Sequence, residues 1–124
     1  MSAVHAPRLQ ATTHEVTVAG TKLYLTVDTA ADGSCAGLWL ELHVRSDPQA
    51  RSWANLWAQA ATKALRCGCS LESVVESVLH ARTEDGGPVQ GDPDIRMCLS
   101  VVDYVARRLA IDFMGRDDLR HSAG

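Results

Sequence analysis

The hydrophobic period of this chain changes once along its length, and that change restricts the folds open to it. In three segments of the first half, apolar side chains alternate with polar ones, which is the period of a half-buried β-strand. These segments are residues 14–18, 23–27 and 38–44. Gly20 separates the first two, and Asp32-Gly33 separates the second from the third, as tight turns require. We therefore predict three antiparallel strands that begin with a hairpin.

Beyond these strands the apolar residues recur with the period of an α-helix, about 3.6 residues. Ser46 or Asp47 can cap a first helix, and Pro48 suits its first turn. Gly68 ends this helix. The stripe that we expect to face the core consists of Trp53, Leu56, Trp57, Ala60, Ala61, Ala64 and Leu65.

Two more helices are predicted, with a long loop between them. Ser70 caps a second helix that ends near Ala81, with Val74, Val75, Val78 and Leu79 buried. Residues 83–93 are rich in glycine, proline and acidic residues, which predicts a loop. The third helix is predicted over residues 97–114, with Val101, Val102, Val105, Leu109 and Phe113 inward.

This order predicts an α+β domain, a three-stranded antiparallel sheet with one face covered by about three helices. We expect residues 13–115 to form the domain, residues 1–12 to be a disordered arm and residues 116–124 a flexible tail. A three-stranded sheet leaves an edge open, and pairing across that edge favours a homo-oligomer, a dimer or higher.

Composition excludes several classes of protein. The net charge of −3 argues against a domain that grips duplex nucleic acid. No apolar stretch is long enough to cross a membrane and no signal peptide is recognisable, so we expect a cytoplasmic protein. The cysteines are expected to be reduced, and Cys67-Gly68-Cys69 has no second ligand pair at metal-binding spacing. We expect neither a metal nor a cofactor.

The candidate binding site lies around the predicted loop, where Arg82 and Arg96 flank the Asp92-Pro93-Asp94 turn. Carboxylates there can accept ribose hydroxyls, and arginines and helix N-terminal N–H groups can bind phosphates. The alternative is that Asp92 or Asp94 caps the third helix while the arginines form surface ion pairs. Both interpretations stay open.

The third helix offers a second candidate site. Asp103 with Arg107, and Arg108 with Asp112, have the spacing of helix ion pairs, which we expect to be solvated. In a symmetric oligomer, copies of Arg107 or Arg108 would instead converge on an anion. The full candidate ligand-binding set is Arg82, Asp92, Asp94, Arg96, Asp103, Tyr104, Arg107 and Arg108.

The tryptophans divide into two kinds. Trp53 and Trp57, one turn apart on the first helix, are expected in the core. Trp39 falls on the polar side of the third strand. It either packs under a helix of a partner chain or lines a pocket.

Residues 91–114 carry a family pattern. Asp92-Pro93-Asp94-Ile95 leads into Ser100-Val101-Val102-Asp103-Tyr104-Val105 and Arg107-Arg108-Leu109-Ala110, and residues 22–27 and 65–72 match more weakly. In these segments the chain resembles the TSCPD domain, the C-terminal accessory domain of cobalamin-dependent ribonucleotide reductases. The resemblance spans about residues 13–115 and implies an α+β fold without catalytic activity of its own.

Three departures from the family limit what the resemblance implies. The several hundred residues of a reductase's catalytic barrel, with its cobalamin site, are absent, so reductase activity is not expected. The mobile Cys-x-x-Cys tail is absent as well, so Cys67 and Cys69 are not assigned its role. Thr83 follows Arg82 where the family usually has an aromatic residue.

Two functions follow from these observations, and no enzymatic motif supports a third. The first is a non-catalytic nucleotide-binding protein, a sponge that sequesters a cyclic ADP-ribose or cyclic oligonucleotide immune signal, since size and element order are similar to phage anti-Thoeris and anti-CBASS proteins. The second is an accessory or regulatory domain that partners a ribonucleotide reductase. An arginine-bearing cleft would favour the first, and an exposed apolar patch the second.

Overall fold

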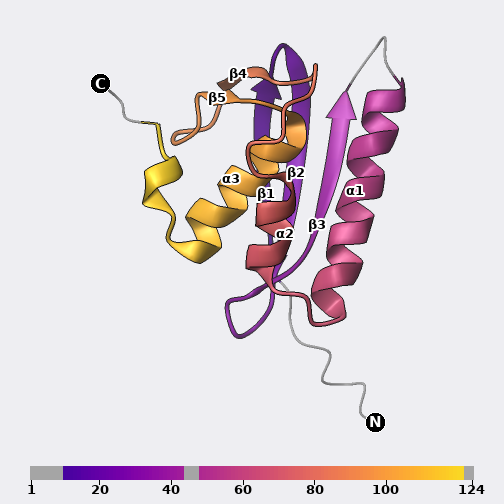
Figure 1. Ribbon diagram of the computed structural model, residues 1–124, viewed down its shortest axis with the longest axis vertical. Coiled ribbons are helices and arrows are strands. Elements are labelled where there is room, and N and C mark those ends of the chain that lie inside the picture. The colour runs from indigo at the N-terminus through magenta and orange to yellow at the C-terminus, as the bar shows by residue number, and fades with distance from the viewer. Residues whose placement is uncertain (1–9, 44–47, 122–124) are drawn as a thin grey trace.

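The computed structural model describes residues 10–43 and 48–121, and every structural statement below refers to these residues. It contains one antiparallel sheet of five strands in the order β3-β2-β1-β4-β5, with three α-helices and a short 3-10 helix, η2 (Figure 1). The strands are β1 (Gln10–Val18), β2 (Thr21–Thr29), β3 (Cys35–His43), β4 (Gly87–Gln90) and β5 (Met97–Cys98). The helices are α1 (Pro48–Arg66), α2 (Leu71–Val78), α3 (Val101–Met114) and η2 (Asp117–Leu119). The α+β class and the three helices are confirmed.

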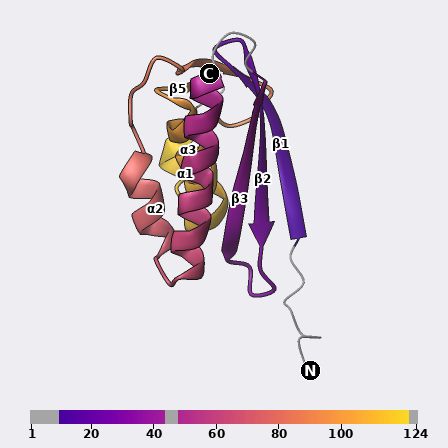
Figure 2. The same ribbon diagram turned by 90° about the vertical axis from the view of Figure 1, so that its right-hand side faces the viewer.

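The three long strands provide one wall of the core. Their inward side chains are Val16 and Val18 of β1, Leu23, Leu25 and Val27 of β2, and Leu38, Leu40 and Leu42 of β3. Figure 2 shows α1, α2 and α3 together on one side of β1–β3. One face of the sheet is therefore covered by helices, as the alternation predicted. β1 begins at Gln10, inside the segment predicted to be an arm.

The prediction of three strands is wrong, because the segment predicted as a loop contains β4. Gln90 pairs with Thr17 and Val89 with Val18, which places β4 beside β1. β5 pairs with β4 and takes the first residues of the predicted third helix, so α3 begins only at Val101. Strands of four and two residues are too short for an alternation of apolar and polar side chains to be recognised. They form because they pair with a neighbour that is distant in sequence.

Helix α1 turns only part of its predicted apolar stripe toward the core: Ala61 is buried and Trp57, Ala64 and Leu65 pack at the margin, but the rest of the stripe is exposed. Trp53 and Leu56 are 73% and 60% exposed, whereas the buried side chains are Ala54, Ala58, Ala61 and Thr62. Only small side chains fit because α1 lies very close to β3. A Cβ atom on Gly37 would lie 3.0 Å from Thr62 Cγ2. The expectation that Trp53 belongs to the core is therefore wrong, and Trp57 is half-buried at its margin.

The helix ends follow local capping chemistry. After α1, Gly68 has φ of +95°, and Cys69 N–H donates to the carbonyl of Ala64 in the pattern of a Schellman motif. Ser70 caps α2 and Ser100 caps α3, each through its hydroxyl. The alternative in which Asp92 or Asp94 caps the third helix is therefore wrong. The predicted caps Ser46 and Asp47 lie outside the described residues.

Candidate functional site

Arg108 of α3 lies at the centre of a buried ionic cluster. Its Nη1 donates to both carboxylate oxygens of Asp92, at 2.9 and 3.1 Å. Its Nη2 donates to Asp94 at 3.0 Å and to Asp112 at 2.7 Å, and its Nε donates to Asp112 at 3.1 Å. The Arg108 side chain is 5% exposed. The expectation of a solvated Arg108–Asp112 pair is wrong, because this guanidinium is enclosed by three carboxylates.

The carboxylate of Asp92 also accepts hydrogen bonds from three donors other than Arg108. Its Oδ1 accepts the backbone N–H groups of Asp94 and Ile95 at 2.8 and 2.9 Å, and its Oδ2 accepts the hydroxyl of Tyr104 at 2.7 Å. Burial opposes ionisation of Asp92, but these hydrogen bonds and the charge of Arg108 outweigh burial and hold its pKa below the usual value. Burial raises the pKa of Tyr104, and the hydrogen bond to Asp92 raises it further. Tyr104 therefore stays a neutral donor.

Asp103 forms a second buried cluster, so the expectation of a solvated pair with Arg107 is also wrong. Its side chain is fully buried and accepts three donors: the backbone N–H groups of His80 and Leu99, at 2.6 and 2.8 Å, and Arg107 Nε at 2.9 Å. His80 has φ of +66°, an unusual conformation for a residue with a side chain, and the bond to Asp103 holds it there. Ser100 Oγ accepts Asp103 N–H at 2.9 Å. This cluster joins the segment after α2 to the start of α3.

The structure distributes the candidate ligand-binding set over three places. Asp92, Asp94, Tyr104 and Arg108 meet in the first cluster, and Asp103 and Arg107 in the second. Arg82 and Arg96 have exposed side chains outside both clusters, and no ion pair of either is found among the described residues. The carboxylates proposed to hold ribose hydroxyls are thus already bound by the protein's own donors.

Two participants were missed because they lie in the segment predicted to be a flexible tail. Arg120 Nη1 donates to Asp94 Oδ1, and His121 Nδ1 accepts the backbone N–H of Arg96 at 2.9 Å. His121 N–H donates to the carbonyl of Asp94 at 2.7 Å. The chain after η2 is therefore attached to the loop between β4 and β5. Neither residue belongs to a sequence motif that would have indicated this contact.

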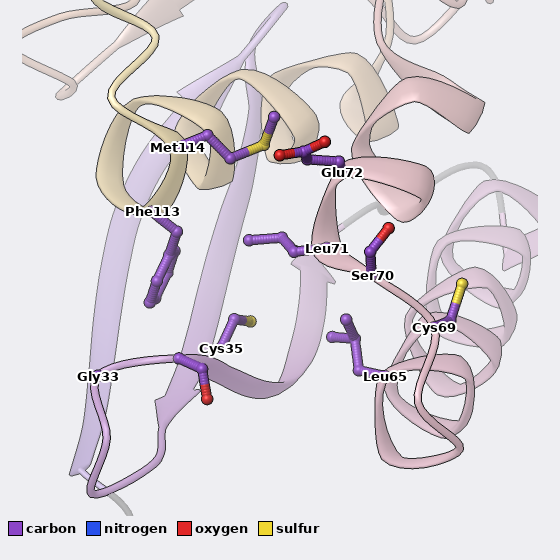
Figure 3. Close-up of a pocket in the computed structure, with 10 residues that line it drawn as sticks. Gly33, Cys35, Leu65, Cys69, Ser70, Leu71, Glu72, Phe113 and Met114 are labelled. Carbon is purple, nitrogen blue, oxygen red and sulfur yellow. The ribbon is translucent and has the colours of Figure 1, made fainter.

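A cavity of about 400 Å³ lies where the β2–β3 turn, the α1–α2 junction and the end of α3 meet. Figure 3 shows Leu71 and the ring of Phe113 projecting over Cys35. Among its lining residues only Glu72 is charged. A cavity whose only charged lining residue is a glutamate does not suit a phosphate-bearing ligand.

The cysteines are unpaired thiols, buried at Cys35 and Cys98 and exposed at Cys67 and Cys69. Burial raises the pKa of both buried thiols. Between residues 10 and 121, leaving out 44–47, no group of three or more potential metal ligands is found.

The largest exposed apolar side chains gather beside β3 and on the outer side of α1. We call Trp39, Trp53, Leu56 and Ala60 the tryptophan face. Trp39 is 51% exposed, and its Nε1 donates to Asp28 at 3.4 Å. Beside it lies a hollow of about 490 Å³ lined by Trp39, Leu56, Gln59, Ala60, Thr62, Lys63 and Arg66. Trp39 thus lines a hollow, which is one of the two alternatives, and the packing of a partner's helix on it stays a prediction.

The geometry defines an α+β domain in which most candidate charges hold the fold together, while an apolar face is left to solvent. Comparison with known proteins gives the family. The TSCPD domain model matches residues 3–113, and the chain belongs to the TSCPD domain family, which confirms the resemblance. No helix among the described residues is long and apolar enough to cross a membrane. No solved structure matches the chain.

The similar curated proteins are vitamin B12-dependent ribonucleotide reductases. That of Bradyrhizobium diazoefficiens is 35% identical over 109 residues, which cover 88% of this chain and 9% of the reductase. The reductase of Agrobacterium fabrum is 35% identical over 114 residues, which cover 92% of this chain and 9% of that reductase. That of Streptantibioticus cattleyicolor is 32% identical over 102 residues, covering 82% and 17%. The chain thus spans less than a fifth of each of these relatives.

Proposed function

We propose that this chain is a non-catalytic accessory module that acts with the catalytic chain of a vitamin B12-dependent ribonucleotide reductase, and that it docks through the tryptophan face. Its relatives carry the same domain within a much longer reductase chain. On this proposal the domain needs a surface through which to contact the catalytic part of the reductase.

The exposed tryptophan face is the observation that carries this proposal. With 51% and 73% of their surfaces in solvent, Trp39 and Trp53 alone expose about 200–300 Å² of mostly apolar area, since an aromatic side chain can bury about 150–250 Å². Trp39, Leu56 and Ala60 line one hollow, and Trp53 lies one helical turn before Leu56 on α1, so exposed apolar side chains on neighbouring elements favour an interaction site here. Tryptophan is also enriched among the residues that dominate binding energy at protein interfaces.

The nucleotide sponge remains a prediction with less support. It requires a pocket in which Arg82 and Arg96 act with free carboxylates, but Asp92 and Asp94 are bound by Arg108, and Arg107 is paired with Asp103. The hollow beside the tryptophan face does contain Lys63 and Arg66, but its walls are mainly apolar. The names of the similar proteins point to a reductase and not to an immune signal. The expected homo-oligomer likewise stays a prediction.

The test is direct binding of the purified reductase encoded in the same genome, measured by biolayer interferometry. Leu56→Asp should abolish binding, because the carboxylate would be desolvated at the interface. Met97→Asp is the matched control, since Met97 is 49% exposed on β5, outside the tryptophan face. Both variants should fold like the wild type. Absence of wild-type binding, or equal loss in both variants, would contradict the proposal.

A nucleotide panel in a thermal-shift assay separates the two functions. We expect no stabilisation by micromolar cyclic nucleotides or ADP-ribose isomers. Stabilisation that disappears in Asp94→Ala or Arg82→Ala would favour the sponge instead.

A further inference from the structure

We propose that the element docking on the tryptophan face is an amphipathic helix with an acidic flank. Its apolar side chains enter the hollow, and its carboxylates pair with Lys63 and Arg66. This inference rests on the proposed function for the location of the interface, and it adds the chemistry and shape of the partner. Three observations lead to it, concerning the edge of β3, the form of the hollow and its charges.

The edge of β3 is closed to a partner strand at its centre. Thr62 Oγ1 accepts the backbone N–H of Leu38 at 3.0 Å and donates to its carbonyl at 3.1 Å. These are the two groups that Leu38 would otherwise offer to an added strand. A partner cannot extend the sheet there without displacing α1. The partner must therefore dock by side-chain packing, and self-pairing across this edge is opposed in the same way.

The hollow lies between one side of α1 and Trp39 of β3, an arrangement into which a second helix can pack. Trp53, Leu56, Ala60 and Lys63 follow one another at intervals of three or four residues, so they lie along one side of α1. Trp39 forms the opposite wall, held by its bond to Asp28. A row of side chains on a second helix packs into such a groove, as ridges pack into grooves between helices.

The charges on the hollow are all of one sign. Lys63 and Arg66, in the last turn of α1, are the charged residues that line it. Within the described residues, neither takes part in an ion pair. Bringing an apolar helix against two unpaired cations would desolvate them without compensation. Carboxylates on the flank of that helix supply the compensation, and acidic residues there would also steer its approach.

The test uses two synthetic amphipathic helices of about 18 residues, near the length of α1. They share a leucine-rich apolar face and differ only in having glutamate or lysine flanks. Binding to the full chain is measured by fluorescence anisotropy. Because no reductase is present, this result is separate from the test of the proposed function.

The wild type should bind the glutamate-flanked peptide about tenfold more tightly, since two charge pairs change from attraction to repulsion in the other. The double variant Lys63→Glu/Arg66→Glu should reverse the preference, and Leu56→Asp should lose both peptides. Arg82→Glu/Arg96→Glu makes the same charge change at exposed arginines elsewhere and should leave the preference unchanged.

The proposal is overturned if the wild type binds neither peptide, if both bind equally, or if the control reverses the preference as well. A concentration-dependent dimer in sedimentation velocity that Leu56→Asp abolishes would overturn it too, because a second copy would then occupy the face. If the reductase still binds in any of these cases, only the acidic-helix inference fails.

Discussion

Replacing Arg108 with methionine should destabilise the domain severely. Methionine keeps much of the side-chain length but removes the one cation that contacts Asp92 within residues 10–43 and 48–121, and the Asp92 side chain is 1% exposed. Breaking a buried ion pair from one side costs about 3–5 kcal/mol, because the remaining charge is left without compensation. The free energy of unfolding of a domain of this size is roughly 6–19 kcal/mol, and each kcal/mol that is lost lowers Tm by about 4 °C. We expect Tm to fall by about 10–20 °C.

The assay is urea unfolding followed by circular dichroism, with a matched control and a rescue. Arg116→Met removes an arginine that also donates two bonds to one carboxylate, of Asp118, but this pair is exposed. Arg116→Met should lower the free energy of unfolding by less than about 1 kcal/mol. Asp92→Asn combined with Arg108→Met should cost less than the sum of the single variants, since the buried charge is removed. Equal losses for Arg108→Met and Arg116→Met would refute the reasoning.

Three further outcomes can be measured on the isolated chain. Because the pKa of Asp92 is held below its usual value, its contribution to stability is present above about pH 4 and is lost as pH falls through the folded-state pKa. Urea unfolding at pH 7 and pH 3 should show this loss, and Asp92→Asn should reduce it. Gly86→Ala should destabilise far more than Gly20→Ala in a thermal melt. A Cβ on Gly86 would lie 2.2 Å from backbone atoms of Leu99, whereas Gly20 has open space and only a positive φ. Thr62→Val should cost about 1–3 kcal/mol in urea unfolding, because both edge groups of one β3 residue lose their partner, and a change under about 0.5 kcal/mol would contradict the closed edge.

The long elements were predictable because their period is a local property. Alternation located β2 and β3, and the helical period located the three helices, with Gly68 and Ser70 correctly placed between α1 and α2. β4 and β5 were not predictable in this way. β4 forms because Val89 and Gln90 pair with β1. Its four residues are too few for a hydrophobic pattern that would predict a strand. The same limit explains why the start of α3 was placed too early.

The orientation of α1 was missed for a different reason. A hydrophobicity pattern ranks tryptophan and leucine above alanine, so it turns the bulky stripe inward. The space actually available is set by Gly37 and Thr62, which bring the helix against β3. Only small side chains, three alanines and Thr62, are buried there. Likewise, the i,i+4 spacing of Arg108 and Asp112 looks the same in solvent as in a core, and Asp92, 16 residues away, decides that Arg108 is buried.

The exposed face of α1 and the buried charge of Arg108 indicate where in the domain a partner contact is expected. The segment that carries the family pattern contains Asp92, Asp103 and Arg108, and each of these side chains is occupied in holding the fold together. The resemblance in this segment therefore indicates a shared fold and not a shared ligand, because replacing one of these residues would leave a buried charge unpaired. The tryptophan face lies outside that segment, and Trp39, Trp53 and Leu56 are each more than half exposed. Trp53 and Leu56 are largely exposed on α1, so a substitution there is expected to affect the proposed docking more than folding.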